Sequence, residues 1–158
     1  MILLAGLLPA ACSKPSGPAP TATASPTERF AHPCQLLPKA DALEVLGPAE
    51  LTSTEEPAGD PGDARCLWSV VGGRGFVDLR IHVPSRKDEI KGGGDGRRSV
   101  GGVGDLALAR PNSSLGDLEV LKGDQTFLVQ VRGANRIQSP DKLQMDAVNI
   151  ARLVAARL

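Results

Sequence analysis

The chain has 158 residues, 41% hydrophobic and 23% charged, which is enough for one globular domain and no more. Lys and Arg number 18, as do Asp and Glu, and a zero net charge argues against a nucleic-acid-binding protein with a basic surface. One Trp, three Phe and no Tyr are too few rings for a platform that stacks bases or sugars.

The N-terminal segment resembles the end of a bacterial lipoprotein signal. Its apolar run is much shorter than the about 20 residues needed to span a bilayer. Small residues, Ala10 and Ala11, precede Cys12 as in a lipobox, although Pro9 stands where such motifs usually have Leu. We expect residues 1–12 to be a signal that ends at a lipidated Cys12. The alternatives are an ordinary secretion signal and an apolar tail with an incidental cysteine.

Residues 13–29 follow as a stretch rich in Pro, Ser, Thr and Ala. This stretch cannot bury enough apolar surface to offset the entropy lost on folding, so we predict a disordered tether. We predict a single folded domain over residues 30–158.

The domain contains two further cysteines, Cys34 and Cys66. An exported protein lies where disulfides form and persist, so the pair predicts a disulfide. Closing a loop of about 33 residues would stabilise the fold by about 3–4 kcal/mol. Two buried free thiols are one alternative, and a metal site is the other. No His or Cys stands at zinc-like spacing from either cysteine, which argues against metal.

The first predicted elements are a short helix and three strands. The helix covers residues 38–46, with Pro38 at its start and Gly47 just past its end. Strands are expected over 50–54, 66–71 and 76–83, and Gly72 to Gly75 form the turn of a hairpin. In 76–83 the alternation places four apolar residues on one face and predicts a wet second face. The apolar residues are Val77, Leu79, Ile81 and Val83, and the polar ones are Asp78, Arg80 and His82.

The second half begins with one helical turn over 86–91, followed by a glycine-rich segment, 92–104, that we expect to be mobile. Strands are predicted over 106–110, 118–122 and 126–132, the last two joined at Gly123-Asp124. The clearest helix follows, with Ser139 as its N-cap and Pro140 at its first position. Its apolar residues recur every three or four positions and form one stripe, namely Leu143, Ala147, Ile150 and Val154.

This order predicts an α+β domain. We expect an antiparallel sheet of about five strands, with a short N-terminal helix and a C-terminal amphipathic helix packed on it.

Three motifs are similar to those of an uncharacterised family of small bacterial envelope lipoproteins, of the actinobacterial type. They are PCQLL (33–37), CLW (66–68) and GVGDLA (102–107), and they match the family patterns PC-x-LL, C-x-W and G-x-GD-x-A. The resemblance implies a lipid-anchored domain, a Cys34–Cys66 bridge and a PsbP-like α/β sandwich. It implies no activity, because the family has no established catalytic residues.

Several potential sites are weak. The 102–107 stretch has the form of a dinucleotide fingerprint, but a strand-like run rather than a helix follows it. His32 and His82 lack an obvious nucleophile and orienting group nearby in sequence, so we expect two solvated imidazoles. The aspartates in glycine-rich turns lack the spacing of a calcium loop.

The stretch 86–98 is mixed in charge, and Arg97 and Arg98 are its strongest candidates for contact with an anionic partner. A solvated loop without a partner is the alternative.

Together these patterns predict a non-catalytic lipoprotein of the cell envelope, held outside the cytoplasm by a lipid such as palmitate. We expect a binding module for an envelope protein, polymer or small ligand, with no cofactor, metal or nucleic acid. A small-ligand carrier and a periplasmic hydrolase are the alternatives.

Overall fold

The computed structural model describes residue 30 and residues 32–57, 63–83, 85–93, 96–110, 114–134 and 138–158. The predicted signal with Cys12 (1–12) and the predicted tether (13–29) lie outside these residues.

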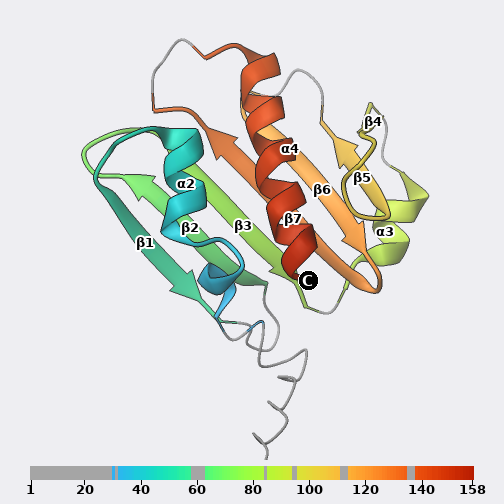
Figure 1. The fold of residues 1–158 in the computed structure, drawn as a ribbon. Coiled ribbons are helices and arrows are strands. Elements are labelled where there is room, and N and C mark those ends of the chain that lie inside the picture. Colours follow the sequence, from blue (N-terminus) through green and yellow to red (C-terminus); the bar gives the residue numbers. More distant parts are fainter. Residues whose placement is uncertain are drawn as a thin grey trace, which may run out of the picture.

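Seven strands form one antiparallel sheet in the order β1-β2-β3-β7-β6-β5-β4 (Figure 1). The strands are β1 (Leu51–Glu56), β2 (Ala64–Val70), β3 (Phe76–His82), β4 (Arg98–Ser99), β5 (Leu106–Ala109), β6 (Gly116–Lys122) and β7 (Gln125–Arg132). The α+β class agrees with the sequence prediction, whereas about five strands is too few. Strand β4 has only two residues, so no alternating pattern could reveal it.

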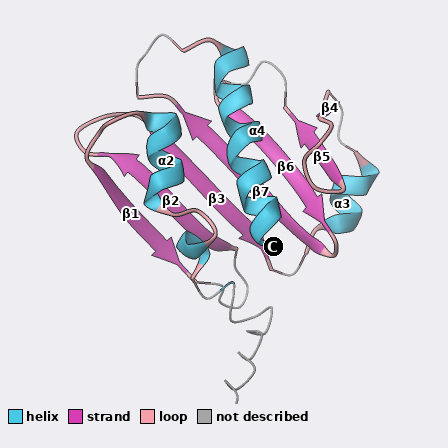
Figure 2. Ribbon diagram, in the orientation of Figure 1, coloured by secondary structure: helices cyan, strands magenta, loops and turns pink. Residues whose placement is uncertain are grey.

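The helices are the 3-10 turn η1 (Pro33–Gln35), α2 (Lys39–Leu46), α3 (Lys87–Gly92) and α4 (Pro140–Arg157). Helices α2 and α4 lie side by side on the same side of the sheet (Figure 2). Within the described part of the chain, no helix is both long and apolar enough to cross a membrane.

Helix α4 forms as its sequence predicts. The Ser139 side chain accepts a hydrogen bond from the Lys142 backbone N–H, and Pro140 occupies the first turn, where no N–H is needed. The predicted apolar stripe is buried along its whole length. It packs on the inward residues of β6 and β7, and this layer forms the main core. Arg157 in the last turn donates to the Leu36 carbonyl and pairs with Asp41.

The first two motifs hold the N-terminal segment against β2. Cys34 and Cys66 are joined by a disulfide, in agreement with the prediction. The Trp68 indole N–H donates to the Leu37 carbonyl at 2.8 Å. Cys66 and Trp68 are two residues apart on a strand, so both side chains point to the same face. The C-x-W pattern therefore serves as a double attachment point for residues 34–37.

The third motif is a turn that fastens one hairpin to another. Gly104 has φ +56°, and a Cβ there would lie 2.5 Å from the Leu121 carbonyl oxygen, so only glycine fits. The Asp105 backbone N–H donates to that same carbonyl, and its carboxylate accepts from the Gly123 N–H. Strand β5 follows directly, as expected for a turn rather than a nucleotide-binding loop.

The predicted mobile segment 92–104 is anchored in its second part. Val103 is buried in the core, β4 pairs with β5, and the Val100 N–H donates to the Ala107 carbonyl. Residues 94–95 lie outside the described residues.

Candidate functional site

The second side of the sheet, which α2 and α4 leave uncovered, is called the open face here (Figure 2). Strand residues alternate between the two sides, so Val77 and Val129 enter the core while their neighbours Asp78 and Leu128 lie on the open face. The prediction of a wet polar face on β3 is wrong in part. Asp78 and His82 are buried, whereas Val83, predicted to share the apolar face, is exposed.

Helix α3 borders the open face at one end. The Arg86 backbone N–H donates to the Thr126 hydroxyl, and Lys87 forms an ion pair with Asp124 at the β6–β7 turn. The hydrogen bond from Lys87 lowers the pKa of the Asp124 carboxyl below its ordinary value, and the same bond raises the pKa of Lys87. Ile90 and Leu121 are both buried but lie outside the main core, consistent with α3 covering the end of β6.

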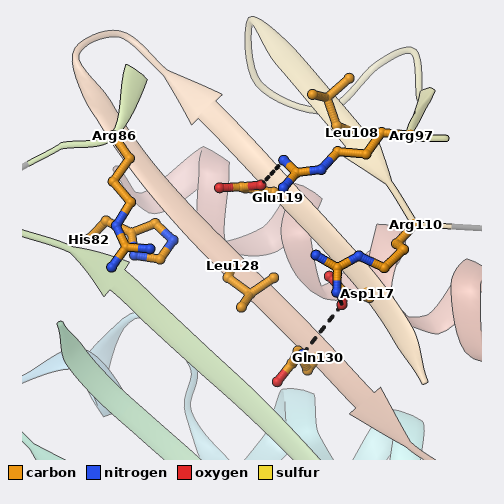
Figure 3. Close-up of a pocket in the computed structure, with 9 residues that line it drawn as sticks. All are labelled: His82, Arg86, Arg97, Leu108, Arg110, Asp117, Glu119, Leu128 and Gln130. Atoms are coloured by element: carbon orange, nitrogen blue, oxygen red, sulfur yellow. Dashed lines mark hydrogen bonds and ion pairs between the residues drawn. The ribbon is translucent and has the colours of Figure 1, made fainter. Parts of the chain in front are cut away.

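A hollow of about 180 Å³ opens on this face (Figure 3). Leu128 on β7 lies near its middle, with His82 and Arg86 to one side and Arg97 and Arg110 to the other. The remaining lining residues are Leu108, Asp117, Glu119 and Gln130.

The open face carries two sets of charged side chains. The first set contains five arginines and is called the arginine layer: Arg65, Arg80, Arg86, Arg97 and Arg110. The second contains three carboxylates that partner four of these arginines and is called the acidic floor: Asp78, Asp117 and Glu119.

Asp78 is the most completely satisfied carboxylate of the acidic floor. Arg65 donates to both of its oxygens, at 3.0 and 2.9 Å, and Arg80 donates two further hydrogen bonds to Oδ2. The hydrogen bond to Asp78 raises the pKa of the Arg65 guanidinium. A buried carboxylate needs such partners, because an unpaired charge away from water is costly.

The other pairs are less complete. Arg97 donates to Glu119 within hydrogen-bond reach, but Arg110 approaches Asp117 only to 3.9 Å. Asp117 also accepts a long hydrogen bond, 3.4 Å, from Gln130. Arg86 lies 3.7 Å from Asp63, beyond a direct hydrogen bond. Within the described residues, Arg86 and Arg110 therefore keep guanidinium N–H groups that no short ion pair occupies.

The two sets differ in depth. Side chains of the acidic floor are 2–15% exposed, whereas those of the arginine layer are 26–63% exposed. The buried carboxylates therefore neutralise the arginines on the side nearer the sheet, and part of each guanidinium remains exposed to solvent. The open face thus presents hydrogen-bond donors around half-buried apolar side chains, including Leu128 and Leu108.

His82 is buried rather than solvated, which corrects the sequence prediction. Its Nδ1 lies 3.1 Å from Asp63 Oδ1, without the geometry of a hydrogen bond. Ser85 is near in sequence, but its buried hydroxyl makes no hydrogen bond within the described part of the chain. Asp63 thus lies beside His82 without a hydrogen bond to orient it, and no described serine hydroxyl contacts the imidazole as a nucleophile would. His32, in contrast, is largely exposed, and its Nδ1 lies 2.9 Å from Glu55.

Arg97 and Arg98, predicted together as contacts, lie on opposite sides of the sheet. Arg98 pairs in register with the core-facing Ala109, so Arg97 before it points to the open face and lines the hollow. Arg98 is exposed at the edge of the sheet and does not line the hollow.

Sequence reasoning missed His82, Arg110, Asp117, Glu119 and Gln130 as members of one site, because they come from four strands and their flanks. The only signal was the polar positions of alternating strands, which do not reveal which strands are neighbours.

Within the described ranges, no three His, Cys, Asp or Glu side chains lie close enough to hold a metal ion. Comparisons with protein-family models, with curated proteins and with solved structures find no match.

Proposed function

We propose that this chain is a lipid-anchored, non-catalytic interaction module of the bacterial cell envelope, whose open face binds a partner protein with acidic side chains. The anchor rests on the sequence: the apolar run, the small residues before Cys12 and the polar tether over 13–29. The binding face rests on the arginine layer.

The proposal rests on one observation: the arginines of the open face are exposed, whereas the carboxylates that pair with them are buried. Outward guanidinium edges above neutralising carboxylates favour a partner that brings carboxylates of its own. Arginine is enriched in protein interfaces, where its flat group stacks on apolar surface and donates several hydrogen bonds. Half-buried leucines at the centre, with arginines around them, match the apolar centre and polar rim of such interfaces.

The size of the hollow supports a protein partner over a carried small ligand. Pockets for drug-sized ligands measure about 300–1,000 Å³, and this one measures about 180 Å³. A hollow of this size can receive one side chain of a partner. A carrier would also need room between the sheet and its helices, but that layer is filled with fully buried side chains such as Leu79, Val129 and Ile150.

A hydrolase is the second alternative, and the one feature that favours it is Asp63 beside His82. Neither the Ser85 hydroxyl nor any other described serine side chain forms a hydrogen bond with His82 that would activate it. We therefore assign His82 to the wall of the hollow.

Co-purification from native envelopes tests the binding face. We expect Arg110→Gln to lower recovery of the partner strongly, because Arg110 is the most exposed and least paired member of the arginine layer. Arg98→Gln is the matched control, since it removes the same charge from the other side of the sheet. Equal recovery with the two variants would contradict the proposed face.

The anchor has its own test. The full gene expressed in a bacterium should incorporate a palmitate analogue, and Cys12→Ala should abolish the label. Equal labelling of both proteins would show that Cys12 carries no lipid.

A further inference from the structure

A second hollow, the end groove, lies at one end of the sheet and differs from the open face in its charge. It is bordered by the β2–β3 turn (Gly72, Gly73 and Arg74), by Arg132 and Gly133 at the end of β7, and by Gln138 before α4. Its volume is about 730 Å³, within the range of small-ligand sites.

Two arginines, Arg74 and Arg132, are the ionisable side chains among the described residues that line the end groove. Neither Arg74 nor Arg132 forms an ion pair with any residue that the structure describes. Every member of the arginine layer, in contrast, has a carboxylate within 4 Å. Among the residues that the structure describes, no carboxylate neutralises the positive charge of the groove.

Contacts around the groove restrict the position of the Arg132 side chain. The Arg132 guanidinium lies over the Phe76 ring, 5.5 Å from its centroid, and this contact favours one position of a long side chain. Gly133 lies so close to the Gln138 side chain that a Cβ at this position would clash with it. Gly72 has φ +66° and open space around it, so its backbone is accessible to a ligand.

We propose that the end groove binds a phosphate group, with Arg74 and Arg132 as its ligands. Two unpaired guanidiniums match a phosphate monoester dianion, whereas one carboxylate would leave half of the charge uncompensated. Arg132 pairs in register with Phe76 on the open face, so this groove adjoins that face but shares no lining residue with the hollow around Leu128. It also lies at the far end of β2 from Cys66, where the N-terminal segment is attached. The β2–β3 turn that borders the groove lies at the end of the sheet opposite to η1 (Figure 1).

The test uses the full chain carrying Cys12→Ser, which keeps every other residue, and phenyl phosphate as the probe. In amide NMR spectra we expect the signals of Gly72, Gly73 and Gly133 to shift on titration. Arg74→Gln and Arg132→Gln should each weaken binding about tenfold or more, since each removes charged hydrogen bonds. Arg132→Lys, which keeps the charge, should weaken binding less than Arg132→Gln.

Two controls make the result decisive. Arg98→Gln removes an exposed arginine without a described ion pair from the edge strand β4, which does not line the groove, and it should leave affinity within twofold. Benzoate, a matched monoanion, should bind at least tenfold more weakly than phenyl phosphate. The proposal is overturned if benzoate binds equally well, if Arg98→Gln weakens binding as much, or if shifts fall on the hollow around Leu128 instead.

Discussion

The two faces of the sheet are built from the same strands but differ in composition: one is apolar and the other is charged. On the side covered by α2 and α4, alternate residues such as Leu79, Val129 and Leu118 are fully buried in one apolar layer. On the open face, the residues between them form the arginine layer and acidic floor. Stability is therefore concentrated on one side, and the other side is available for recognition.

The open face is nevertheless part of the fold. Asp78 is as deeply buried as a core residue, and it is held by two arginines rather than by apolar packing. A face built this way can present charge without leaving a carboxylate unpaired. We therefore expect substitutions in the core to lower the free energy of unfolding most, and substitutions on the open face to lower it least.

The largest effect should come from the covered face. Leu79→Ala should destabilise the fold by about 2–5 kcal/mol, since it removes a fully buried side chain and leaves a cavity. Leu128→Ala, the matched change on the same sheet's open face, should cost less than half as much because Leu128 is only half buried. Urea unfolding followed by Trp68 fluorescence measures both. Equal losses would show that the two faces do not differ in their contribution to stability.

The next effect concerns the attachment of the N-terminal segment to the covered face. Replacing Cys34 and Cys66 together by Ala should lower stability by about 2–4 kcal/mol, by releasing a loop of about 33 residues in the unfolded chain. Non-reducing peptide mapping of protein from envelopes should recover the two cysteines in one linked peptide pair. Two free thiols after rapid alkylation would refute the bridge.

A smaller effect is expected beneath the arginine layer. Asp78→Asn keeps the shape of the side chain but removes the charge that Arg65 and Arg80 share, and should cost about 1–3 kcal/mol. Asp141→Asn, on the exposed first turn of α4, is the control and should stay within about 1 kcal/mol. If Asp78→Asn were neutral in thermal and urea unfolding, the acidic floor would have no structural role.

The sequence predicts the framework better than the site, and the reason is physical. Helix α4 has a cap, an N-terminal proline and a stripe, all of which are local signals. The disulfide is predicted from two cysteines and an expected export signal. The hollow depends on which strands are neighbours: Leu128 lies between Arg80 and Glu119 only because β7 separates β3 from β6. No spacing along the chain encodes that order.

The motifs that carry the family resemblance have structural roles. Cys66 and Trp68 fasten residues 34–37, and Gly104 with Asp105 fastens two hairpins. These residues explain why the domain folds, and they lie apart from the residues that line the hollow. The three motifs and the residues that line the hollow are therefore separate sets in this chain.

The most direct test of the account is site-specific photocrosslinking in the native envelope. A photoreactive phenylalanine analogue is placed at Leu128, in the hollow, or at Met145, which is exposed on α4 on the opposite side of the sheet. The account predicts one discrete adduct from position 128, lost on adding Arg110→Gln, and none from position 145. Adducts of equal yield from both positions, or an adduct from position 145 alone, would contradict the claim that the open face is the binding face.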